Sequence, residues 1–90
     1  MRERVIERRL VAECHKAGIV CMKFVSPGHA GVPDRIVLHE GRTTFIEVKA
    51  PGMKPTKLQE NCHKNLREAG FEVVVLDNPD DIEALVERLA

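Results

Sequence analysis

The spacing of apolar residues along the chain predicts both helices and strands. Apolar residues recur at helical spacing over about Arg4–Ala17, before Gly18, and over about Pro55–Ala69, before Gly70. Apolar and β-branched runs predict strands at Ile19–Val25, Arg35–Leu38, Thr43–Lys49 and Phe71–Leu76, and Asn78-Pro79 begins a final helix that runs to Leu89. We therefore expect one domain over residues 1–90 with an α/β fold. Its order is α-β-β-β-α-β plus a C-terminal helix, with a mixed sheet flanked by helices.

Two packing expectations follow from the same pattern. The second helix carries an apolar stripe of Leu58, Cys62, Leu66 and Ala69, which is expected to face the sheet. The strand at Phe71–Leu76 is apolar throughout, so we expect it to be buried on both faces.

Charged residues interrupt the apolar pattern of the third predicted strand. Glu47 and Lys49 lie two residues apart, so they point to the same face of the sheet. If the hairpin turn centres on Glu40-Gly41, Asp34 lies opposite Glu47 on the neighbouring strand. Like charges at opposed positions destabilise a sheet. A cation between the carboxylates would remove this cost, although a simple buried ion pair of Glu47 with Lys49 also explains part of the pattern.

The chemistry of this group favours a hard cation. Carboxylate and backbone oxygens suit Mg²⁺, whereas the absence of His or Cys from the group makes Zn²⁺ less favoured. Glu7 borders the packed face of the first helix. Alone it is best interpreted as an edge glutamate that reaches solvent, but beside Asp34, Glu47 and Lys49 it is better explained as part of a shared site.

Pro33-Asp34, followed a dozen residues later by Glu47-Val48-Lys49, resembles the PD-(D/E)xK nuclease superfamily. A closer resemblance is to the VRR-NUC (virus-type replication-repair nuclease) domain in its stand-alone form. The stretches that carry this resemblance are Ile6-Glu7-Arg8, Lys23–Gly28, Gly31–Arg35, Phe45–Gly52 and Gln59. The predicted element order also matches the core of that superfamily.

The resemblance implies metal-dependent hydrolysis of phosphodiester bonds. Asp34, Glu47 and the backbone carbonyl of Val48 would ligate Mg²⁺, for which Mn²⁺ would substitute. Lys49 would orient or deprotonate the attacking water and offset negative charge in the transition state. Glu7 would hold a second ion, or would act on the first through a water molecule.

The resemblance also gives Gln59 a place near the lysine and the scissile phosphate, although the residue pattern alone indicates only an exposed helix glutamine. Fourteen basic residues balance fourteen acidic ones, which excludes binding to nucleic acid by bulk charge. The charge is uneven, however, with a net +6 over residues 1–67 and −6 over residues 68–90. Candidate contacts to the phosphate backbone are Lys23, Ser26, His29, Arg35, Lys54 and Lys57, to which Lys64 and Arg67 add positive charge.

We expect an endonuclease that cuts DNA according to its structure, for example at four-way junctions or branches during replication, repair or recombination. Stand-alone relatives resemble junction-resolving dimers, and two cuts require two sites, so a homodimer is expected. The alternatives are a nucleic-acid-binding module that does not cut, a nuclease subunit directed by a partner, and a structural subunit with a buried ion pair. No apolar run is long enough for a membrane span, and the expected location is the cytoplasm of a bacterial or phage-infected cell.

Overall fold

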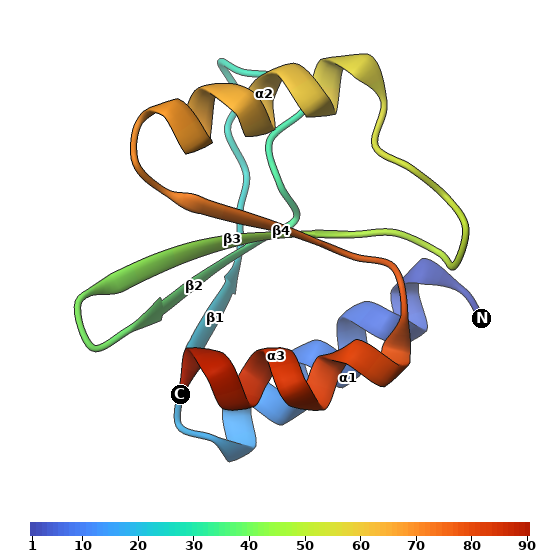
Figure 1. Ribbon diagram of the computed structural model, residues 1–90, viewed down its shortest axis with the longest axis vertical. Coiled ribbons are helices and arrows are strands. Elements are labelled where there is room, and N and C mark those ends of the chain that lie inside the picture. Colours follow the sequence, from blue (N-terminus) through green and yellow to red (C-terminus); the bar gives the residue numbers. More distant parts are fainter.

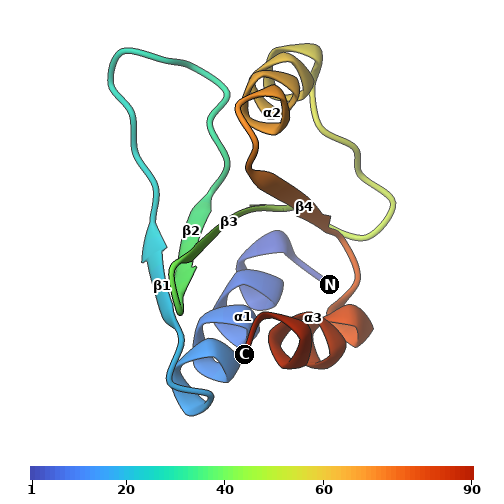
Figure 2. The same cartoon turned by 60° about the vertical axis from the view of Figure 1, so that its left-hand side comes forward.

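A computed structural model describes all residues, 1–90, and shows a four-stranded sheet with helices on both faces (Figure 1). Helices α1 and α3 cover one face, and α2 lies over the other (Figure 2). The elements in chain order are α1 (Glu3–Lys16), β1 (Val20–Lys23), β2 (Arg35–His39), β3 (Arg42–Val48), α2 (Lys57–Glu68), β4 (Glu72–Leu76), the 3₁₀ turn η1 (Pro79–Asp81) and α3 (Ile82–Leu89). This order confirms the expected α/β fold with a C-terminal helix.

The strands follow one another across the sheet in the order β1-β2-β3-β4. The two pairs β1/β2 and β2/β3 are antiparallel, and β4 is parallel to β3, so the sheet is mixed as expected. The β2–β3 hairpin turns through Glu40 and Gly41, both with positive φ, as a two-residue turn requires. Arg35 pairs with Ile46. One further step of this ladder brings Asp34 level with Glu47, which is the register that the turn predicts.

The apolar core lies on the side of the sheet that α1 and α3 cover. These two helices contact each other as well as the sheet. Inward-facing residues of β2, β3 and β4 complete the same cluster, to which α2 contributes no residue. Its buried side chains are Ile6, Leu10, Cys14, Ile19, Val37, Ile46, Val48, Leu76, Ile82, Leu85, Val86 and Leu89.

Helix α2 packs differently from the sequence expectation. Leu58, the first residue of the predicted stripe, is 56% exposed, and His63 is the buried residue of the helix. The stripe turns instead toward the β1–β2 connection, where Leu58, Cys62 and Leu66 line a hollow of about 510 Å³ with Phe24. The face of α2 that meets the sheet is therefore polar.

The prediction that the last strand is buried on both faces holds for its apolar residues, because Val74 and Leu76 lie on the core side whereas Val73 and Val75 lie on the other face. β4 is an edge strand in which Val73 and Leu76 are buried, Val74 and Val75 are partly covered and Glu72 is exposed. Only β2 and β3 have strands on both sides, and β3 has the more continuous run of buried residues. No helix of the protein is both long enough and apolar enough to cross a membrane.

The loop before β2 touches α2 at a position that only glycine fits. Gly31 has a φ of 82°, and a Cβ atom there would lie 2.9 Å from the backbone oxygen of Leu58. A separation below 3 Å between Cβ and a backbone atom forces one of the two segments to move. Because Asp34 follows three residues later, this contact helps to set the distance between Asp34 and α2.

We expect Gly31→Ala to lower the free energy of unfolding by roughly 1–3 kcal/mol, since it adds both backbone strain and a steric overlap. Gly28→Ala is the matched control, because Gly28 lies in the same loop, has no positive φ and has no atom within 4 Å of an added Cβ. Urea unfolding of both variants measures the difference. Equal stabilities would show that the loop moves freely away from α2.

Candidate active site

A buried carboxylate on the central strand forms the centre of the site. Glu47 is 1% exposed, although its neighbours Ile46 and Val48 point into the apolar core on the other face. Burial, and then the negative charge of Asp34, raise the pKa of Glu47 to about 7, while Lys49 opposes this shift. The free energy of the fold therefore depends on what surrounds this one side chain.

Asp34 reaches the site from the segment just before β2. Its Oδ2 accepts a hydrogen bond of 2.8 Å from the backbone N–H of Val48, and its own carbonyl accepts one of 2.9 Å from Phe24. The first bond ties the aspartate to β3, and the second continues the pairing of the β1 side with β2. Asp34 is thus held from two directions, beside Glu47.

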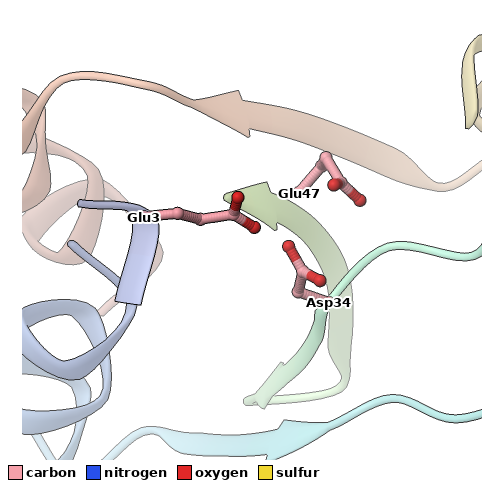
Figure 3. Close-up of side chains that lie close together, drawn as sticks. All are labelled: Glu3, Asp34 and Glu47. Atoms are coloured by element: carbon pink, nitrogen blue, oxygen red, sulfur yellow. The ribbon is translucent and has the colours of Figure 1, made fainter. Parts of the chain in front are cut away.

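A third carboxylate comes from the beginning of α1. Single oxygens of Glu3, Asp34 and Glu47 all lie within 4.8 Å of one another. Figure 3 shows Glu3 extending from the helix toward the two acids of the sheet. Glu3 is exposed, Asp34 is partly covered and Glu47 is buried, so the group opens to solvent on the side of α1.

Lys49 and Gln59 both contact the same oxygen of Glu47. Lys49 Nζ lies 3.4 Å from Oε2, and Gln59 Nε2 donates a 3.2 Å hydrogen bond to it. Gln59 also closes a capping box at the start of α2, where its Oε1 accepts from the Thr56 N–H at 2.9 Å and its N–H donates to Thr56 Oγ1. The cap orients the amide, because Oε1 must face the Thr56 donor and Nε2 must then face Glu47.

A histidine lies behind the carboxylate, contrary to the expectation that none is near it. His63 is 1% exposed, and its Nε2 lies 3.8 Å from Glu47 Oε1. Burial, with Arg67 and Lys49 nearby, lowers the pKa of His63. The sequence contains one indication that His63 is near the site, because His63 lies four residues after Gln59 and so shares its helical face.

Glu7, which the sequence predicts to hold a second ion or to act through a water molecule, lies outside the group of three acids. Its Oε2 accepts a 2.7 Å hydrogen bond from Arg35 Nε in a partly buried ion pair. Glu3, one helical turn closer to the N-terminus, lies in the group instead. Both glutamates lie on one side of α1, so the helical pattern alone did not separate them.

The chain resembles a phage protein in sequence and a solved domain in fold. The chain is 51% identical over 81 residues to "Putative nuclease p44" of Acyrthosiphon pisum secondary endosymbiont phage 1. The aligned region covers 89% of this chain and 87% of the relative. A solved structure described as a VRR_NUC domain superposes with a TM-score of 0.86 and 26% identity, covering 98% of this chain and 97% of the other. The chain belongs to the VRR-NUC family of nucleases. No protein-family model matches it.

The acids of this VRR-NUC domain fit a divalent cation. Glu47 Oε1 is buried without a hydrogen-bond partner, and three carboxylates converge beside a single lysine. An all-oxygen group of this kind suits Mg²⁺ or Mn²⁺. Asp34, Glu47 and Glu3 are the side chains that would hold the ion.

The other predicted residues of the VRR-NUC domain surround the acids on several sides. Lys23 and Arg35 line a hollow of about 660 Å³ beside α1, and Ser26 and His29 line the hollow beside α2. Lys54 borders a third hollow of about 550 Å³, which His63 also lines. Lys57 is exposed in the first turn of α2. The structure therefore does not bring the predicted phosphate contacts onto one continuous stripe.

The raised pKa of Glu47 predicts how the stability of the metal-free protein depends on pH. A carboxyl with a folded pKa near 7, against a model value of 4.5, favours the folded state when protonated. Glu47 contributes its full stabilisation below about pH 4.5 and loses it as the pH rises through 7. The total change in the free energy of unfolding is about 3 kcal/mol. Urea unfolding from pH 4.5 to 8 with a chelator present measures it.

Glu47→Gln is the control, because it is nearly isosteric and does not titrate. The difference in unfolding free energy between the two proteins cancels titrating groups far from Glu47 and keeps its coupling to the groups that face it, namely Asp34, Lys49, His63 and Glu3. We expect this difference to change with pH in favour of the variant as the pH rises. A difference that stays constant from pH 4.5 to 8 would contradict the buried, perturbed carboxyl.

Proposed function

We propose that this VRR-NUC domain is a metal-dependent endonuclease that hydrolyses phosphodiester bonds in DNA, with Asp34, Glu47 and Glu3 as the cation-binding acids. The observation that carries the proposal is the convergence of these three carboxylates, from three separate elements, within 4.8 Å. A divalent cation held there would polarise the phosphate and lower the pKa of a water molecule. The printed name of the phage relative supports the same class of activity.

The side chains of the protein supply the rest of the chemistry. Lys49 projects beside Glu47, where its positive charge offsets the charge that develops on the phosphate in the transition state and orients the attacking water. Gln59 fixes Glu47 through Oε2 and so keeps the carboxylate from rotating. The backbone carbonyl of Val48 stays a proposed additional ligand, since Val48 follows Glu47 at the end of β3.

The hollow beside α1 supports a path for the phosphate backbone next to the acids. It is lined by Arg4, Arg8, His15, Lys23 and Arg35, with Glu7 paired to the last of these. Arg4 and Arg35 directly follow Glu3 and Asp34 in the chain, so the hollow is close to the acids along the backbone, although Arg35 lies on the α1 side of the sheet and Asp34 on the other. Basic contacts of this kind hold nucleic acid independently of its sequence.

The finer parts of the proposal concern the form of the substrate and the assembly. We propose selectivity for the form of the DNA, branched or four-way-junction, in place of selectivity for a base sequence, because backbone contacts from the basic and small polar side chains of the hollows carry no sequence information. A homodimer would supply the second site that paired cuts on two strands need. The cytoplasmic location, in a bacterial or phage-infected cell, stays a prediction.

Cleavage of labelled duplex, flap and four-way-junction DNA with Mg²⁺ or Mn²⁺ tests the activity. We expect Lys49→Ala and Glu3→Gln each to lower kcat by at least about 100-fold, since each removes a charged group from the reacting centre. Glu7→Gln is the matched control one helical turn away, and we expect it to keep most of the activity. Loss of cleavage activity in Glu7→Gln, with full activity in Glu3→Gln, would show that Glu7 and not Glu3 belongs to the active site.

The contrary result is that the folded wild-type protein cuts none of the three substrates with either metal. That result would favour the binding module that does not cut or the nuclease that needs a partner. Binding of Mn²⁺ by the protein alone distinguishes these two alternatives. The pure binding module has no use for the three acids, which repel phosphate. The partner-directed nuclease keeps the cation site.

The hollow beside α1 gives a separate prediction for binding. Arg8→Glu should weaken binding to junction DNA and reduce the slope of log K against log salt by about one, as loss of one phosphate contact does. Arg9→Glu is the matched control, because Arg9 is the next residue of α1 and lines a different hollow, against α3. Titrations at several salt concentrations, with Ca²⁺ in place of Mg²⁺, measure both. Equal effects would mean that only net charge matters.

A further inference from the structure

His63 is a buried polar residue to which the proposed chemistry gives no task. It is 1% exposed, and its Nε2 has no hydrogen-bond partner. It is the buried residue of α2, on the face that the helix turns toward β3. An unpaired polar group in such a place costs about 1–3 kcal/mol, so a compensating interaction is expected.

An oxygen of Glu47 near His63 is likewise buried without a hydrogen-bond partner. This oxygen, Oε1, lies 3.8 Å from His63 Nε2. The other oxygen of Glu47 has Gln59 at 3.2 Å and Lys49 at 3.4 Å. A water molecule about 2.8 Å from both Oε1 and Nε2 would bridge their 3.8 Å gap only with a compressed angle of roughly 85°, so a direct contact is the better geometry. A small shift that forms a direct hydrogen bond would satisfy both atoms.

The direction of that bond follows from the chemistry of the two groups. An ionised carboxylate only accepts hydrogen bonds, so Nε2 must carry the proton. A cation requires the ionised form of Glu47. The hydrogen bond from His63 therefore becomes strongest in the same state in which Glu47 can act as a ligand.

We propose that His63 is a positioning residue, whose Nε2–H donates to Glu47 Oε1 and, with Gln59 on Oε2, fixes the plane of the carboxylate for the divalent cation. This inference rests on the proposed function. It assigns to α2 two donors, Gln59 and His63, spaced one helical turn apart and each directed at one oxygen of the same ligand. Hydrogen-bond donors behind metal ligands typically change metal affinity by about 10- to 100-fold.

Binding of Mn²⁺ to the full chain, followed by isothermal titration calorimetry, tests the proposal with two substitutions of matched chemistry. His63→Gln places an amide N–H at about the position of Nε2, whereas His63→Asn is one methylene shorter. We expect His63→Asn and His63→Leu to raise the dissociation constant for Mn²⁺ by about tenfold or more, and His63→Gln to stay within about threefold of wild type.

A core variant separates this effect from general destabilisation. Val86→Ala removes two methyl carbons from the core beneath α3, away from α2, and should lower the melting temperature without changing the dissociation constant. Wild-type affinity in His63→Asn and His63→Leu would overturn the positioning role while the proposed function stands. A wild-type protein that binds no Mn²⁺ would overturn the proposed function, and this inference with it.

The protonated nitrogen can also be identified in the wild-type protein, which avoids variants that fail to fold. Long-range ¹H–¹⁵N NMR spectra distinguish the two neutral tautomers of histidine. With Mg²⁺ bound, we expect the proton of His63 on Nε2. A proton on Nδ1, with Nε2 unprotonated toward Glu47, would overturn the proposal even if every variant behaved as expected.

Discussion

A carboxylate buried on the central strand constrains the rest of this structure. Glu47 lies between two residues that point into the apolar core, so the pleat of β3 directs it to the opposite face, where it is 1% exposed. Burial and the nearby Asp34 charge disfavour its ionised form. Lys49 and Gln59 compensate part of this cost through contacts with Glu47 Oε2, and a bound cation would compensate more.

The main apolar cluster and the candidate site lie on opposite faces of the sheet, although Phe45 and Val73 are also buried on the face that carries Glu47. The cluster under α1 and α3 holds the apolar core, and α2 adds nothing to it. On the other face, α2 presents an amide and an imidazole to Glu47. Its start is fixed by the capping box of Thr56 and Gln59, so the same amide that begins the helix also orients the carboxylate.

The features that could be predicted from the sequence depend on the helical and strand spacing of residues and on the hairpin turn. The hairpin turn at Glu40-Gly41 sets the register, and this register brings Asp34 to Glu47, while strand alternation places Lys49 on the same face. The family resemblance directed attention to Gln59. Glu3 and His63 could not be selected in this way. The choice between Glu3 and Glu7 depends on a long-range ion pair with Arg35, and the burial of His63 depends on how α2 rotates about its axis.

The third acid lies on the part of its helix that opens most easily. Glu3 is the first residue of α1, and Arg2 before it provides no side-chain cap, so the unpaired N–H groups of this turn are satisfied only by solvent. A turn of this kind frays on its own. Asp34 and Glu47 are held by the sheet, whereas Glu3 lies on a turn that has no side-chain cap. Binding of a cation by Glu3 would order the first turn of α1, at a cost in conformational entropy. The ion would then stabilise this turn, so the turn and the cation site would become ordered together.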